Sequence, residues 1–524
     1  MKTQVFRIFI LILGLLGIFG GGTLWAQLPC EPGDKIYEYI DLWEARGYIS
    51  KVPPLRPYSN QYILSVLEDV SLRGGEDGRT AREMLAELTE RFSLNPEPGH
   101  TSRFTPEAYY SETGADFPFT GNLHPLVSYS GRAGIWIISM PEEGDLLPRG
   151  TVPVRDYLSD WSDFDLFERN FLVRQSLSVS TSIGNENIYF NAGLNRGSYG
   201  PFFENGLIIG PQAPNTGQFA LTWRLRKTII TIATFMLSAS TNSGAGIYPG
   251  KYLQFHSITA YPFPWLELGI LESVIYGGRF EPYYLVPLSE FFYFQGTIGF
   301  PDNSMVGFSG KIRFPYNLQY ALILYIDDIH FNDVVRFDFD TKYKVALQTG
   351  LFWTPEISWL SRMALDYTMV TPYTYSHVSK TDINYQNYTT GGELLGPALE
   401  PNSDRVTLKA DFYPLPWLKI TGKGIFSRHG NASEGETDGD GTIFDDGFDD
   451  QGKPTFQETT RFLIQDVLEY RIQGGVDSEL AFSLKGRRKL YGNLGYALEY
   501  VINEDLTDSR NIYNYFTLGF SCRF

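Results

Sequence analysis

From about residue 109 onward, hydrophobic and polar residues alternate in short segments of the chain. The clearest case is the final segment, Asn511–Phe524, where counting back in twos places Leu518, Phe520 and Phe524 on one face. A period of two indicates a β-strand with one apolar face. We predict strands at Leu123–Ser130, Phe171–Ser182, Ile188–Leu194, Phe219–Arg226, Thr228–Leu237, Leu253–Tyr261, Leu266–Tyr276, Met305–Phe314, Leu318–Ile326, Tyr343–Phe352, Ile357–Tyr367, Val406–Tyr413, Leu418–Phe426, Phe462–Ile472, Glu479–Arg487, Leu490–Ile502 and Ile512–Phe524.

The connections between these segments fall into two classes. The short ones contain proline between aromatic residues, and they are Tyr261–Trp265, Phe314–Leu318, Trp353–Ile357 and Tyr413–Trp417. The long ones are polar and acidic, and they are Gly277–Ser304, Asp327–Lys342, Thr371–Asp404 and His429–Thr460. Short turns at one end of the strands and long loops at the other are typical of a transmembrane β-barrel.

Strand parity also predicts which side chains face the interior. In Val406–Tyr413, an outward face with Val406 and Leu408 leaves Lys409 and Asp411 inside. An interior with charges of both signs is hydrated, and it fits both a conducting lumen and one closed by salt bridges.

The amino-terminal part of the chain has a different pattern. Residues 1–27 have two basic residues, an apolar run and a small residue near Ala26, which predicts a secretory signal peptide rather than a retained anchor. Residues 28–94 show helical spacing, with helices expected at Asp34–Arg46, from Ser59 onward and at Thr80–Phe92. We interpret 95–108 as a Pro- and Gly-containing linker and 109–524 as the barrel.

Composition supports this division. Aromatic residues make up 15% of the 524 residues and hydrophobic residues only 43%, as expected when each strand offers lipid every second residue. The formal net charge of −17 becomes −19 without the two basic residues of the signal segment, which argues against nucleic acid as a partner. Two cysteines, Cys30 and Cys522, permit a disulfide in an exported chain, but parity places Cys522 on the lipid face. Pro29 argues against lipid attachment at Cys30.

We find no pattern that points to catalysis or to a cofactor. The six histidines form no zinc-binding motif, and Gly246–Lys251 departs from a phosphate-binding loop because Tyr252 follows it. Asp327 with His330 is too isolated to indicate an active site. The acidic loop Gly430–Gly452 has oxygen ligands for calcium, but its spacing favours a solvated loop, so no metal site is expected.

Several stretches resemble known proteins. The final strand resembles the terminal strand of outer-membrane β-barrels, which the barrel-assembly machinery reads. The order and spacing of further stretches resemble the Wzi family of capsule-assembly outer-membrane proteins: Asp41–Ser59, Arg196–Trp223, Phe255–Arg279, Tyr283–Gly296, the stretch from Asp302 and the one ending at Ile329. The resemblance implies a closed antiparallel barrel of about 16–18 strands with a periplasmic helical bundle, in the outer membrane.

The resemblance also implies a non-catalytic function in binding surface polysaccharide and assisting capsule or exopolysaccharide assembly or attachment. The expected partners are that glycan, outer-membrane lipid and the assembly machinery, and the protein is expected to be a monomer. Candidate polysaccharide-binding residues are Glu272, Arg279, Asp302, Asn303, Asp327 and Asp328, unless they form rim salt bridges and turns. Alternation places Glu272 in lipid, so we predict a bulge that turns it inward. The alternatives are a porin for small solutes and a soluble periplasmic β protein.

Overall fold

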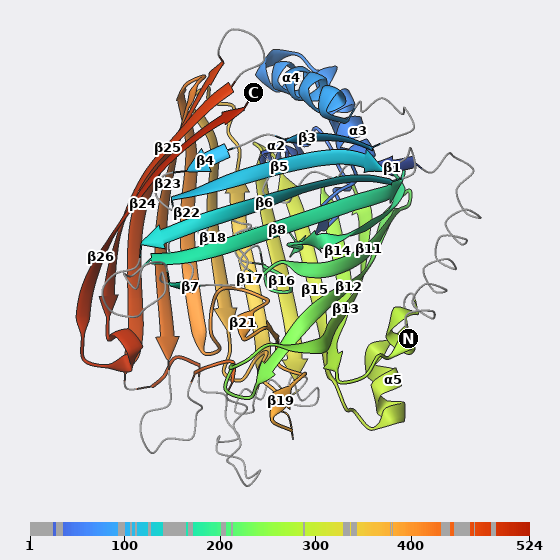
Figure 1. Cartoon of the computed structure of the whole chain (residues 1–524), viewed down its shortest axis with the longest axis vertical. Coiled ribbons are helices and arrows are strands. Elements are labelled where there is room, and N and C mark those ends of the chain that lie inside the picture. The colour runs from blue at the N-terminus through green and yellow to red at the C-terminus, as the bar shows by residue number, and fades with distance from the viewer. Residues whose placement is uncertain are drawn as a thin grey trace.

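Most of the described chain forms one antiparallel β-sheet, with three helices at one end of it (Figure 1). The computed structural model describes residues 25–27, 35–92, 100–104, 107–109, 113–123, 127–139, 164–165, 171–200, 206–210, 213–286, 289–328, 336, 343–377, 379, 381–430, 441–444, 462–465, 467–483 and 489–523. Within these ranges the large sheet contains 22 strands.

The first strands of the sheet are β1 (Trp25–Gln27), β3 (His100–Phe104), β4 (Glu107–Tyr109), β5 (Thr113–Leu123), β6 (Val127–Ser139), β7 (Phe164–Asp165), β8 (Phe171–Gly184) and β9 (Ile188–Asn195). The middle strands are β11 (Thr216–Arg224), β12 (Thr228–Thr241), β13 (Tyr248–Phe263), β14 (Leu266–Gly277), β15 (Asn303–Phe314), β16 (Leu318–Asp328), β17 (Lys344–Trp353), β18 (Leu360–Val370) and β19 (Ile383–Asn384). The last strands are β22 (Ser403–Leu415), β23 (Leu418–Gly430), β24 (Leu468–Ser483), β25 (Lys489–Ile502) and β26 (Arg510–Arg523).

Each long strand pairs with the next long strand along the chain. The pairing runs from β11 to β18, through β22 to β26, and from β5 through β6 and β8 to β9. β9 pairs with β11 over most of its length, and β26 meets β4 through one residue pair, Gly519 with Tyr109. The end of β26 lies at the same end of the sheet as the helices (Figure 1).

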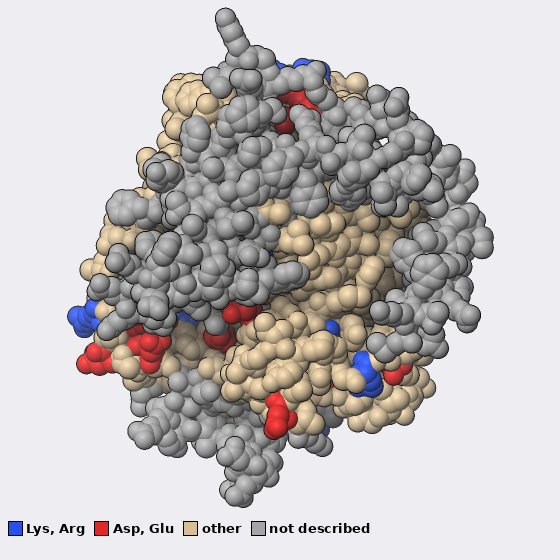
Figure 2. All heavy atoms as spheres, in the orientation of Figure 1, with Lys and Arg blue, Asp and Glu red and all other residues tan. Residues whose placement is uncertain are grey.

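The outward face of the sheet is apolar, as the alternation predicts. Ile270, Leu408 and Leu494 are 61%, 47% and 58% exposed, while their neighbours along each strand point to the other side. Near the short turns, exposed aromatic rings form stacked pairs, including Phe263 with Trp265. In Figure 2 the charged side chains of the described residues gather mainly toward the two ends of the molecule. A face with this distribution matches a hydrocarbon band bordered by aromatic residues.

The three helices at the short-turn end are α2 (Ile36–Ala45), α3 (Asn60–Ser71) and α4 (Gly75–Phe92), which confirms the three predicted helices. Gly47 adopts a positive φ after α2, and the Ser59 hydroxyl accepts a hydrogen bond from the Tyr62 N–H at the start of α3. Their apolar faces pack around Trp43 and Leu67, and Tyr189 of β9 completes this core.

Two two-stranded sheets lie apart from the large sheet. β2 (Leu55–Arg56) pairs with β10 (Ser198–Tyr199), so the segment between α2 and α3 is attached to the chain that follows β9. β20 (Thr389–Thr390) pairs with β21 (Glu393–Leu394) inside the long connection that follows β18.

Several predicted boundaries are wrong. Leu123–Ser130 is the end of β5 and the start of β6, while Phe462–Ile472 and Glu479–Arg487 both overlap the single strand β24. In β24 the pair Gly474 and Gly475 interrupts the hydrophobic alternation but not the pairing with β23. The predicted linker 95–108 contains β3 and β4, so the sheet begins before residue 109. Its helix-breaking residues Pro96 and Gly99 precede β3.

Some predictions fall on other parts of the chain. Residues 1–24 of the predicted signal peptide, Cys30, His330 and most of the acidic loop 430–452 lie outside the described residues. Trp25–Gln27, at the end of the predicted signal peptide, pairs with β8.

Candidate functional site

Three of the six predicted site residues, Glu272, Arg279 and Asp302, lie around a small cap on the outer face of the sheet. The cap consists of η1 (Pro282–Leu285) and α5 (Phe291–Ile298), which lie outside the strands at the end away from α2, α3 and α4 (Figure 1). The Arg279 guanidinium pairs with the Asp302 carboxylate, which also accepts a hydrogen bond of 2.7 Å from the Tyr284 hydroxyl. These contacts hold η1 against the sheet.

The predicted bulge at Glu272 is wrong. The register of β14 is continuous through Glu272 on both sides, where it opposes His256 of β13 and Val306 of β15. Glu272 therefore keeps the outward parity of Ile270, and its carboxylate accepts a hydrogen bond of 3.1 Å from the Phe291 N–H of α5. A covering helix replaces the bulge as the reason that an acidic residue is tolerated there.

The other three predicted residues occupy different places. The Asn303 side chain donates to the Gln386 carbonyl at 3.0 Å, and the Asp327 carboxylate accepts from the Tyr375 N–H at 2.8 Å. Both contacts are made to the long connection after β18. Asp328 is exposed and opposes Lys344 in the β16–β17 ladder, beyond a register shift. The six residues thus do not form one site.

The long connection after β18 folds into the interior of the sheet. Tyr375 and Tyr388 are buried beside Tyr325 of β16, and the Tyr375 hydroxyl donates to the Leu207 carbonyl at 2.8 Å. Together with Leu207, Ile208, Ile209 and Ala213 they form an apolar core against the inner faces of β11–β17. This core packs on the inner face of the sheet near the long-loop end.

The helices occupy the interior at the other end. Lys311 of β15 lies between Glu44 of α2 and Glu267 of β14, with N–O distances of 2.8 and 3.0 Å. Lys419 of β23 contacts Glu38 of α2 at 2.9 Å. These inward lysines attach α2 to the sheet.

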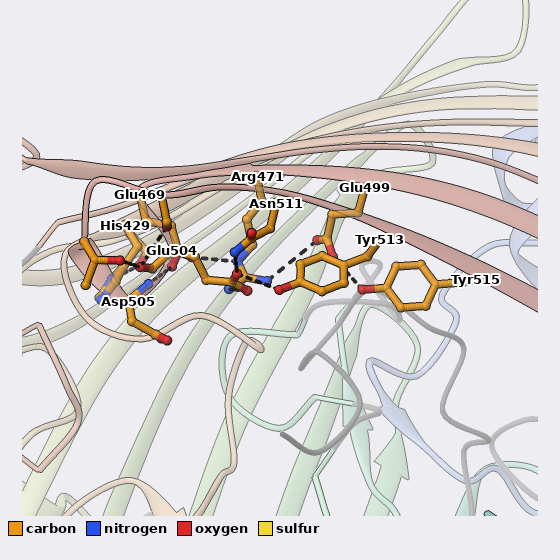
Figure 3. A network of polar contacts seen from close by, with 12 residues as sticks. His429, Glu469, Arg471, Glu499, Glu504, Asp505, Asn511, Tyr513 and Tyr515 are labelled. Atoms are coloured by element: carbon orange, nitrogen blue, oxygen red, sulfur yellow. Dashed lines mark hydrogen bonds and ion pairs between the residues drawn. The ribbon is translucent and has the colours of Figure 1, made fainter. Parts of the chain in front are cut away.

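A polar network lies on the inner face of β24, β25 and β26 at the long-loop end (Figure 3). Its orientation follows from the register: Ser427 has the same parity as the inward Lys419, and Ser427 opposes Arg471. The outward neighbours Ile472, Leu498 and Ile512 are exposed and apolar. Arg471 and the side chains around it therefore face the interior.

Arg471 is the centre of this network. Its Nε lies 2.6 Å from Glu469, and its two other nitrogens lie 3.9 Å from Glu499 and 3.7 Å from Glu504. Glu499 is fully buried, and Arg471 is about one-quarter exposed. Three carboxylates surround one guanidinium, so the network is acidic in balance.

Two tyrosines and a tight turn complete the network. The Tyr513 and Tyr515 hydroxyls donate to Glu504 at 2.6 Å and to Glu499 at 2.8 Å. Their rings lie on adjacent inward positions of β26, with centroids 6.5 Å apart (Figure 3). Glu504 is the first residue of η2 (Glu504–Leu506). Asn503, which directly precedes η2, has a positive φ.

This set of groups suits a neutral polyhydroxylated ligand. Carboxylates accept hydrogen bonds from hydroxyl groups, Arg471 and Asn511 donate them, and the half-buried tyrosine rings offer apolar faces. None of these residues was predicted as part of a site, although the spacing of Glu469 and Arg471, and of Asn511, Tyr513 and Tyr515, places each set on one face of its strand.

Within the described ranges there is no group of three or more His, Cys, Asp or Glu side chains that suits a metal ion. None of the helices described is long and apolar enough to cross a membrane.

Comparisons with known proteins identify the fold. No family model and no curated protein sequence matches this chain. Among solved structures, Wzi of Escherichia coli, an outer membrane protein involved in group 1 capsule assembly and a carbohydrate-binding β-barrel, is 12% identical with a TM-score of 0.54. The match covers 94% of this chain and 98% of Wzi.

Two other matches are proteins of Pseudomonas aeruginosa. The outer membrane protein OprD is 9% identical with a TM-score of 0.43 over 81% of this chain and 93% of OprD. OccD3 is 11% identical with a TM-score of 0.40 over 81% of this chain and 90% of OccD3. The fold assignment rests on Wzi: this chain has the Wzi-like fold that its sequence resemblance implies.

Proposed function

We propose that this chain is a closed transmembrane β-barrel of the outer membrane that binds surface polysaccharide without catalysis. Following the strand pairings from β11 leads through β26 and β4 to β9 and back to β11. The sheet has 22 strands, of which β1, β7 and β19 are short. Without these three, and with β3 and β4 counted as one interrupted strand, 18 strands remain. An even number fits chain ends on one side of the membrane, and the exposed apolar outer face supports that placement.

The side of the membrane follows from the loops. Short turns, the helices and the end of β26 share one end, as periplasmic features do in outer-membrane barrels. The long connections and the Arg471 network are then on the cell-surface side. In this position the network meets glycan rather than periplasmic solutes.

The filled interior supports a binding protein over a porin for small solutes. Helix α2 contacts the inner face at one end through Lys311 and Lys419, and the core around Tyr375 and Tyr388 packs against the inner faces of β11–β17 at the other. A diffusion pore needs a continuous aqueous path, which packed side chains at both ends oppose.

The observation that carries the proposal is the pair Tyr513 and Tyr515 beside Glu504 and Arg471. Aromatic faces pack against the CH groups of sugar rings, and the surrounding carboxylates accept hydroxyl hydrogen bonds. Together with the Wzi-like fold, this supports a role in assembling or attaching capsule or exopolysaccharide. The expected partners are that polysaccharide, outer-membrane lipid and the barrel-assembly machinery, and the expected state is a monomer.

The test is retention of the purified, detergent-solubilised protein on immobilised surface glycan of its source cell. We expect the wild type to be retained and Tyr513→Ala to bind the glycan about tenfold more weakly, which corresponds to a loss of about 1.4 kcal/mol of binding free energy. Tyr496→Ala is the matched control, because Tyr496 lies on the outward face of β25. Equal elution of the two variants would exclude this site, and no retention of the wild type would contradict glycan binding.

A further inference from the structure

The cap formed by η1 and α5 carries an apolar surface that faces away from the sheet. Phe292, Tyr293 and Phe300 are 58%, 72% and 55% exposed, and Tyr283 and Ile298 lie beside them with smaller exposure. Phe292 packs against Phe300, and Tyr283 stacks on Phe294. This is a contiguous aromatic patch on a short helical element.

The inner side of the cap explains why it is there. Beneath it, three outward positions of β13 and β14 are polar, Gln254, His256 and Glu272, and beside them the outward Val274 and Tyr276 pack against Tyr284 and Phe291 of the cap. Gln254 and His256 are buried, and the His256 ring lies 4.4 Å from the ring of Phe291. Polar side chains at lipid-facing positions are costly, and α5 covers them while presenting its own aromatic side chains outward.

The patch continues the apolar face of the strands beneath it. Ile258, Ile270 and Phe308 are exposed on the outward faces of β13, β14 and β15, and α5 lies farther along the same strands. The charged residues Arg279, Glu281 and Glu290 border the patch, as residues at headgroup depth do. The occupant that fits an apolar surface continuous with the lipid face and bordered by charge is the membrane itself.

We propose that the η1–α5 cap is an interfacial anchor whose aromatic residues insert into the outer leaflet of the membrane at the cell-surface end of the barrel. This inference rests on the membrane placement proposed above. Phe292, Tyr293 and Phe300 occupy the boundary between acyl chains and headgroups, and α5 lies in the membrane plane. The cap therefore fixes the height of the barrel in the bilayer beside the glycan-binding end.

The test is collision accessibility of nitroxide labels in the full chain reconstituted in phosphatidylcholine vesicles. Single labels are attached after Tyr293→Cys, Ile270→Cys or Leu72→Cys in a background with Cys30→Ser and Cys522→Ser. Ile270 lies on the outer face of β14, and Leu72 is exposed beyond α3. Oxygen reports lipid, and a water-soluble nickel complex reports solvent.

We expect the label at position 293 to collide several-fold more with oxygen than with nickel, as at position 270, and the label at position 72 to show the reverse. A position 293 that behaves like position 72 overturns the anchor while leaving the barrel in the membrane. A position 293 shielded from both reagents indicates a protein partner and also overturns it. If position 270 itself behaves like position 72, the membrane placement of the proposed function fails.

Discussion

Lys419 of β23 and Glu38 of α2 are 381 positions apart in the sequence, and the lysine Nζ donates a hydrogen bond of 2.9 Å to the glutamate Oε2. Partial loss of water around Glu38 by itself raises the pKa of its half-exposed carboxyl, but the charges of Lys419, Arg362 and Lys409 outweigh this effect and lower the pKa to about 2. The contact thus attaches the helices to the strands only while Glu38 is ionised.

This attachment predicts a pH dependence of stability. Because the pKa of Glu38 is lower in the folded than in the unfolded chain, its contribution is present above about pH 4.5 and is lost as the pH falls toward 2. We expect the thermal midpoint of the wild type to exceed that of Glu38→Gln at pH 7 and to converge with it near pH 2. A constant difference between the two midpoints across this range would contradict the role of the pair.

Lys311 predicts a larger effect, because it is buried between two carboxylates. Lys311→Met leaves Glu44 and Glu267 without their shared cation, which we expect to destabilise helix attachment by about 3 kcal/mol. The measurement is the denaturant concentration at which the helices detach, monitored by the rate of proteolysis between α4 and the sheet.

The matched control for Lys311 is Lys227→Met, since the Lys227 amino group is at the surface and donates to the Pro262 carbonyl at 3.4 Å. Adding Glu44→Gln to Lys311→Met is expected to restore part of the loss, because one of the two facing charges is removed. Equal midpoints for Lys311→Met and Lys227→Met would show that the buried contact does not hold the helices.

The inserted loops depend on close backbone contact at Gly210. A Cβ at this position would lie 2.5 Å from the Gly396 carbonyl oxygen, and the Gly210 N–H donates to Leu395 at 2.8 Å. We expect Gly210→Ala to separate the two segments, at a cost of about 1–3 kcal/mol, and to speed protease cleavage within residues 371–402. Gly422→Ala, whose Cβ would meet nothing within 4 Å, is expected to leave the cleavage rate unchanged. Equal cleavage rates for Gly210→Ala and Gly422→Ala would show that the Gly210 contact does not hold the two segments together.

Two substitutions of Tyr513 distinguish the contribution of its ring from that of its hydroxyl to glycan binding. Tyr513→Phe removes the hydroxyl that donates to Glu504 and keeps the ring, so we expect it to retain most of the glycan affinity that Tyr513→Ala loses. The comparison uses elution of both variants from immobilised surface glycan. A Phe variant as weak as the Ala variant would assign the effect to the hydroxyl and the Glu504 geometry.

Local patterns in the sequence predicted what local physics decides. The alternation of Val406 and Leu408 with Lys409 and Asp411 gave the outward and inward faces correctly, because strand parity needs only neighbouring residues. Ser59 marked the start of α3 for the same reason.

Contacts between distant segments were not predictable in this way. Alternation placed Glu272 outward correctly, but it contains no information about α5, whose Phe291 N–H binds the carboxylate from 19 positions away. The insertion of Tyr375 beneath Leu207 depends on two loops meeting inside the sheet, 168 positions apart. The Arg471 network required registers of three strands, which fix which of many acidic residues share one face.

The central claim is that this is a membrane barrel whose interior is filled and which binds glycan instead of conducting solutes. Its most direct test is conductance of the purified full chain in a planar lipid bilayer, beside a variant lacking residues 35–92 and with residues 381–395 replaced by a Gly-Ser linker. The account predicts insertion without conductance for the wild type and stable steps for the variant. Stable, large ohmic steps from the wild type would contradict it.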